Sequence, residues 1–115
     1  MKRLGVVLAV VGAGLALLSA LPRPAVAGDG REAVSYGRAL FQAKGCIACH
    51  LHREVNPGAG VAVGPDLTEV VLDPAYLRAW LLNPASIRPG TRMPNLGLSE
   101  SEIEALIAFI NYAAE

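Results

Sequence analysis

Both cysteines of the chain lie in the short segment C-I-A-C-H at residues 46–50. Two thiols three residues apart on a helical turn, with a histidine directly after the second, form the pattern by which a c-type haem is attached. Cys46 and Cys49 would bind the two vinyl groups of one porphyrin as thioethers, and His50 would bind the iron through its imidazole. The segment therefore predicts one covalent haem c with His50 as the proximal iron ligand.

Other uses of a cysteine pair fit this chain less well. A redox-active dithiol is typical of a βαβ context, which the sequence around the pair does not suggest. A structural zinc site needs four ligands, and the chain has no second cysteine pair or distant histidine to complete one. An ordinary surface histidine at position 50 would leave two thiols unexplained, so we adopt the haem interpretation.

A second axial ligand is expected from the other half of the chain. Apart from the initiator, Met93 is the only methionine, and it stands between Arg92 and Pro94 in a stretch with little helical or strand signal. A methionine that only fills a core would more naturally lie on the apolar face of a helix. The competitor His52 lies two residues from His50 and therefore on the same side of the ring. We expect Met93 to be the distal iron ligand, because a thioether opposite an imidazole gives a six-coordinate iron with a raised potential.

Helices must position these groups, and two of them are expected before residue 84. Helical spacing of apolar residues predicts the first over residues 31–44, stopped by Gly45. The second begins at Asp73 and Pro74, with the aspartate as N-cap and the proline in the first turn, and ends before Pro84. One face of the second helix is expected to carry Leu77, Trp80 and Leu81.

The last helix has the strongest signal. Residues 99–102 read S-E-S-E, which is a capping box. A buried stripe with i, i+3, i+4, i+7 spacing follows, made of Ile103, Leu106, Ile107 and Ile110. Residues 51–72 and 84–98 are interrupted by Pro and Gly and are expected to be irregular. The predicted fold class is therefore all-α, with three to four helices and long loops wrapped around the haem.

Size and charge exclude several classes of protein. The chain has 115 residues, with 10 Lys and Arg against 10 Asp and Glu. This length allows one small domain and excludes a two-domain enzyme. A neutral chain with no basic cluster is not expected to bind nucleic acid.

The N-terminal segment has the form of an export signal. Lys2 and Arg3 precede an uncharged apolar run over residues 4–21, and A-V-A follows at residues 25–27. We expect cleavage after Ala27, and the alternative is a retained membrane anchor at residues 4–21. The expected organisation is a signal peptide or anchor at 1–27 and a haem domain at 28–115. The haem domain is then exported, to the periplasm or the outer face of the cytoplasmic membrane.

Taken together, these residues resemble the class I mono-haem cytochromes c from about Val34 to Ala113. The residues that carry the resemblance are Gly37, Phe41, the segment 46–50, G-P-D-L at 64–67, W-L-L-N-P at 80–84, P-G-T-R-M-P at 89–94 and L-I-A-F-I at 106–110. The resemblance implies that the Pro65 carbonyl accepts a hydrogen bond from His50, and that Leu67 and Trp80 lie in the haem environment, Trp80 near a propionate. It also implies that the first and last helices cross at Gly37.

The stretch from Tyr76 to Pro94 is especially similar to the cytochrome c domain fused to subunit II of some haem–copper oxidases. The resemblance implies an electron-transfer protein, not an enzyme, with redox proteins as partners and no small-molecule substrate. One alternative is a membrane-tethered haem subunit of a larger oxidoreductase, and a more distant one is a peroxidase or gas sensor with a labile sixth ligand. Lys44, Arg53 and Arg92 are expected to form a positive rim at the docking edge.

Overall fold

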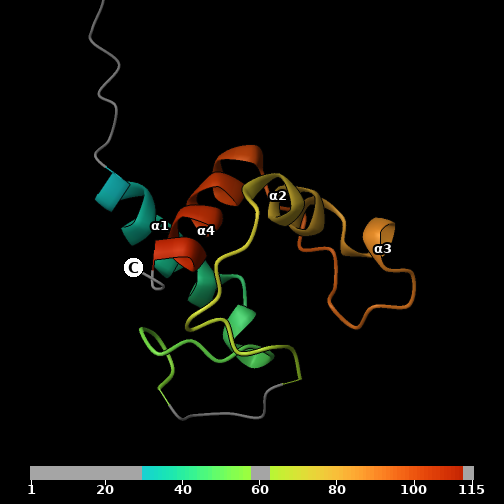
Figure 1. Ribbon diagram of the computed structural model, residues 1–115, viewed down its shortest axis with the longest axis horizontal. Coiled ribbons are helices and arrows are strands. Elements are labelled where there is room, and N and C mark those ends of the chain that lie inside the picture. Colours follow the sequence, from blue (N-terminus) through green and yellow to red (C-terminus); the bar gives the residue numbers. More distant parts are fainter. Residues whose placement is uncertain (1–29, 58–62, 113–115) are drawn as a thin grey trace, which may run out of the picture.

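The computed structural model describes residues 30–57 and 63–112, and in these ranges it contains helices and loops but no strand. The elements follow the order α1, η1, α2, α3 and α4 (Figure 1). This confirms the all-α class. The expected export segment, residues 1–27, lies outside the described residues. Over the described ranges, no helix has both the length and the apolar character needed to cross a membrane.

Helix α1 runs from Gly30 to Ala43 and agrees closely with the prediction for residues 31–44. It ends because Gly45 adopts a left-handed backbone conformation, with φ at 80°, which a residue with a side chain rarely takes. The Lys44 N–H still donates to the Leu40 carbonyl at 2.8 Å. The chain then turns directly into the 3₁₀ helix η1, Cys46–Ala48.

Helix α2 runs from Pro74 to Leu82 and begins as the sequence predicts. The Asp73 carboxylate accepts a hydrogen bond from the Tyr76 N–H at 2.8 Å, which satisfies one free donor of the first turn. A short helix α3, Pro84–Ile87, follows where the sequence analysis expected only irregular chain. That expectation was wrong because Pro84 suits the first position of a helix, while four residues are too few to show a periodic pattern.

Helix α4 runs from Glu100 to Tyr112, and its capping box is formed in both directions. The Ser99 N–H donates to Glu102 Oε2 at 2.8 Å, and the Glu102 N–H donates back to Ser99 Oγ at 3.3 Å. All residues of the predicted stripe are buried, with Ile103 and Leu106 fully inaccessible. The last helix is therefore confirmed in its start and its buried face.

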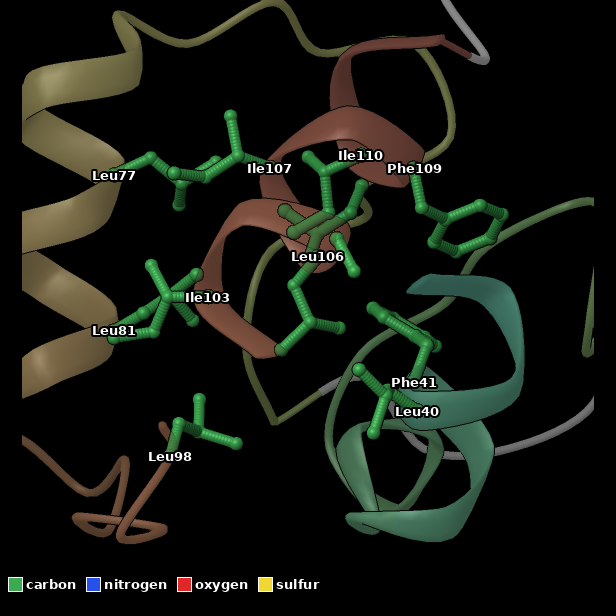
Figure 2. Close-up of a cluster of buried hydrophobic side chains, with 12 residues drawn as sticks. Leu40, Phe41, Leu77, Leu81, Leu98, Ile103, Leu106, Ile107, Phe109 and Ile110 are labelled. Atoms are coloured by element: carbon green, nitrogen blue, oxygen red, sulfur yellow. The ribbon is translucent and has the colours of Figure 1, made fainter. Parts of the chain in front are cut away.

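The core lies where α1 crosses α4, with α2 packed beside α4 (Figure 1). A Cβ added at Gly37 would lie 1.9 Å from the Ala105 carbonyl oxygen, so the two helices approach too closely there for any side chain. The rings of Phe41 and Phe109 meet edge to face next to this contact, with centroids 5.5 Å apart. Figure 2 shows side chains of α1 and α2 pointing toward the side chains of α4. The expected crossing at Gly37 is confirmed.

Candidate haem-binding site

A cavity of about 780 Å³ opens between the helices and the loops that connect them. This volume falls within the range of ordinary small-molecule and cofactor sites. The residues singled out from the sequence all line it, namely Cys46, Cys49, His50, Pro65, Leu67, Trp80 and Met93. The structure thus brings together groups from four separate parts of the chain.

The two thiols are held on a single tight turn. Hydrogen bonds from the Cys49 N–H at 3.1 Å and the His50 N–H at 2.9 Å both end on the Cys46 carbonyl. Both thiols are free, and burial raises the pKa of the Cys46 thiol. Redox-active dithiols instead have a lowered pKa, because they react as thiolates. The turn therefore presents Cys46 as a neutral thiol at the cavity wall, which fits a thioether partner better than a redox dithiol.

One ring nitrogen of His50 is hydrogen-bonded within the protein. Its Nδ1 lies 2.8 Å from the Pro65 carbonyl oxygen. A carbonyl can only accept, so Nδ1 carries the proton, and in the neutral ring the lone pair is on Nε2. Histidine ligands of metals are commonly oriented by such a bond on the other ring nitrogen. His50 is thus prepared to bind a metal through Nε2, with Pro65 in the position that the resemblance implies.

The segment 63–67 is fastened alongside the segment that carries His50. The Val63 and Gly64 N–H groups donate to the Cys49 carbonyl at 3.0 and 2.8 Å. The Leu67 N–H donates to the Leu51 carbonyl at 2.9 Å. These bonds place the Pro65 carbonyl where it meets the imidazole.

Met93 lies in the loop that follows α3, and its side chain is half-buried. The Trp80 indole N–H donates to Met93 Sδ at 2.9 Å, and the Met93 N–H donates to Thr91 Oγ1 at 3.2 Å. The contact between Trp80 and the thioether was not predicted from the sequence. The placement of Trp80 near a haem propionate stays a prediction.

The competitor His52 lies elsewhere. It is fully buried in the core, packed against the rings of Phe41 and Phe109, whose centroids are 5.5 and 4.3 Å away from its own. Its Nδ1 accepts a hydrogen bond from the Glu54 N–H at 3.2 Å, and within the described residues its buried Nε2 has no partner. Burial lowers the pKa of His52, which favours the neutral ring. His52 does not line the cavity and is a core residue.

The positive rim expected around the site is smaller than the sequence suggested. Lys44 Nζ lies 2.9 Å from Glu102 Oε1, and Arg53 Nη1 lies 3.2 Å from Glu69 Oε1. Only Arg92 of the three expected cations has no ion pair among the residues that the structure describes. Two of the three charges are therefore partly neutralised by a neighbour in the same chain.

The residues around the cavity fit a haem of the c type. They offer two thiols on one turn, an imidazole with a free nitrogen, a thioether from a separate loop, and an apolar wall. That wall includes Phe41, Leu77, Leu81, Leu106 and Ile110. No further group has to be assumed for attachment or for axial ligation.

Comparisons with known proteins point the same way. The family described as cytochrome c oxidase, cbb3-type, subunit III matches residues 32–110. A protein named cytochrome c oxidase subunit 2, from Alkalihalophilus pseudofirmus, is 35% identical over an alignment of 85 residues that covers 64% of this chain and 24% of that protein. The chain therefore spans about a quarter of the length of this relative. No solved structure matches the chain. The predicted resemblance to the cytochromes c, and to an oxidase subunit II among them, is thereby confirmed.

Proposed function

Because the chain belongs to the cytochrome c family described as cytochrome c oxidase, cbb3-type, subunit III, we propose that it carries single electrons through one covalent haem c. Cys46 and Cys49 would form the thioethers, and His50 and Met93 would be the axial iron ligands. When bound, the haem supplies exchange of one electron between ferrous and ferric iron. The partners would be other redox proteins, and no small-molecule substrate is needed.

One observation carries this proposal. The lone pair of His50 Nε2 and the sulfur of Met93 belong to residues of one cavity, and each side chain is fastened by a hydrogen bond to a neighbour. Pro65 holds the imidazole and Trp80 contacts the thioether, and these two bonds would favour retention of both ligands in either oxidation state. Two retained ligands leave no open position at the iron, which favours electron exchange over substrate turnover. The apolar wall limits the access of water to the same space.

The ligand set is tested by replacing Met93 with alanine in the purified holoprotein, after a pyridine haemochrome spectrum has established the haem type. We expect the near-infrared sulfur-to-iron absorption of the ferric protein to disappear, the reduction potential to fall and ferrous protein to bind carbon monoxide. Leu96→Ala is the matched control, because Leu96 is a half-buried residue of the same loop and cavity. The control should keep the absorption and exclude carbon monoxide.

Two outcomes would contradict the proposed ligation. If Met93→Ala keeps the near-infrared absorption, Met93 does not bind the iron. If the unmodified ferrous protein binds carbon monoxide readily, the sixth position is labile, and a peroxidase or gas sensor becomes the better description.

A second candidate is a membrane-tethered haem subunit of a larger oxidoreductase complex. The matching family and the relative are both named as oxidase subunits, which favours it. The basic and apolar N-terminal segment supports export to the periplasm or the outer membrane face under either candidate. N-terminal sequencing of the exported protein separates them: a start at Gly28 indicates a free carrier, and an intact residue 4–21 segment indicates a tether.

Two exposed arginines offer a surface for an acidic redox partner. Arg88 and Arg92 both line the cavity that Met93 lines, and neither has an ion pair among the described residues. Electron-transfer rates with such a partner should fall as ionic strength rises. Rates that do not depend on salt would show that these charges do not steer docking.

A further inference from the structure

Gly64 lies against the face of the His50 imidazole. A Cβ added at Gly64 would be 2.4 Å from Cε1, 2.8 Å from Nδ1 and 3.0 Å from Nε2 of that ring. The distances to both nitrogens are only slightly longer than the distance to the carbon between them, so the added atom would sit over the ring face and not beyond its edge. Separations this short do not occur between real atoms, and one of the two residues would have to move.

The backbone conformation at Gly64 does not itself require glycine. Positive φ angles occur in the described residues at Gly45, Gly90 and Gly97, and Gly64 is not among them. An alanine could therefore adopt the backbone of Gly64 without strain. What the site demands is the absence of a side chain next to the imidazole.

Neither the segment around Gly64 nor the His50 imidazole can move easily. The Gly64 N–H donates to the Cys49 carbonyl at 2.8 Å, and the Leu67 N–H donates to the Leu51 carbonyl at 2.9 Å, so the segment is tied on both sides of Gly64. The imidazole is tied through Nδ1 to Pro65 at 2.8 Å. An added methyl group would therefore push the imidazole ring away from the segment, because this is about the only movement that the ring can still make.

We propose that Gly64 is a positioning residue that sets the tilt of the His50 imidazole and thereby the direction of the Nε2 lone pair. The Pro65 carbonyl fixes which way Nδ1 points, and the bare α-carbon of Gly64 supports the ring face. Two contacts of different kinds from adjacent residues define the ring plane. The inference deepens the proposed function and rests on it for the role of His50 as an iron ligand.

The test is Gly64→Ala in the ferric holoprotein, read by the paramagnetically shifted haem methyl resonances. The plane of the axial imidazole sets how unpaired spin is distributed over the haem, so a tilted ring changes the order or the spread of these resonances. We expect such a change together with a shifted reduction potential, while the near-infrared absorption of the Met93 ligand remains. A Gly64→Ala protein that keeps the methyl pattern of the unmodified protein would overturn the inference.

Gly37→Ala is the matched control. It is the same substitution with an even more severe clash, since its Cβ would lie 1.9 Å from the Ala105 carbonyl oxygen, but it lies in the contact of α1 with α4. It should lower the melting temperature and leave the methyl pattern unchanged. An equal change of pattern in both variants would show a general loss of packing and would also overturn the inference.

A measurement on the unmodified protein does not depend on whether any variant folds. In the ferrous holoprotein, a nuclear Overhauser contact is expected between the Gly64 α-protons and the His50 Hε1 proton. Its absence would overturn the inference. The same spectrum tests the proposed function separately, because His50 ring resonances without the strong haem ring-current shift would show that His50 is not a ligand.

Discussion

Replacing Trp80 by phenylalanine removes one N–H group and leaves an aromatic ring beside Met93. The indole N–H now donates to Met93 Sδ at 2.9 Å. Its positive end points at the sulfur that we propose to bind the iron. Ferric iron carries one more positive charge than ferrous iron, so this dipole favours the ferrous state and raises the reduction potential.

The size of the effect follows from the strength of one hydrogen bond. A neutral hydrogen bond contributes about 0.5–1.5 kcal/mol net, and we take about 1 kcal/mol as the difference between the two oxidation states. For a one-electron couple, a tenfold change in equilibrium, or about 1.4 kcal/mol, corresponds to about 59 mV. Trp80→Phe should therefore lower the reduction potential by about 40 mV.

The assay is a potential titration of the holoprotein followed by visible absorption, with the near-infrared band recorded to show that Met93 remains bound. Tyr76→Phe is the control, because the Tyr76 ring lies near Trp80, with a centroid distance of 6.2 Å, and its hydroxyl can be removed while the indole N–H is kept. The control should keep the potential of the unmodified protein. A Trp80→Phe potential equal to or above that of the unmodified protein, with the band retained, would refute the reasoning.

Three further predictions concern stability. Gly37→Ala should destabilise the protein by about 1–3 kcal/mol through overpacking, in spite of a helix-propensity gain of about 1 kcal/mol, and calorimetry should show a melting temperature several degrees lower. The pKa of Glu102 is lowered by the hydrogen bond from the Ser99 N–H and by Lys44, so its stabilisation is present above the unfolded pKa and is lost as pH falls. Glu102→Gln should therefore be less stable than the unmodified protein at neutral pH, and urea unfolding should show the difference narrowing below about pH 4. Asn111→Ala removes two hydrogen bonds to the backbone of Leu72, at 3.0 and 2.9 Å, and should lower the unfolding free energy measured in urea by about 1–3 kcal/mol. Equal stability of either variant and the unmodified protein at neutral pH, or a melting temperature of Gly37→Ala that is not lowered, would contradict these assignments.

The helices were predictable because their signals are local. The capping residues Asp73 and Ser99 precede their helices directly, and the apolar stripe after Ser99 repeats over more than two turns. Helix α3 could not be predicted, because four residues are too few to show a periodic apolar pattern and a proline such as Pro84 also suits a turn.

The candidate site could be predicted from the sequence wherever its chemistry depends on residue type alone. Cysteine, histidine and methionine can be recognised as candidate haem-binding residues from their residue type, so the candidates could be named without a structure. The contact of Trp80 with Met93 depends on how α2 faces the following loop, which no pattern in the sequence encodes. The proposed role of Gly64 could not be predicted from the sequence, because it depends on the His50 ring that the fold places against this glycine.

The crossing of α1 and α4 joins the two ends of the described domain, and this has a consequence for the order of events during biogenesis. A chain is synthesised from its N-terminus, so α4 is the last of the described helices to emerge, and the contact at Gly37 cannot close before then. Cys46 and Cys49 lie inside the long loop that this contact closes. Covalent attachment of the proposed haem to these thiols would therefore have an interval in which to occur, between the exposure of the cysteines and the meeting of the two helices, while the polypeptide has not yet closed around the site.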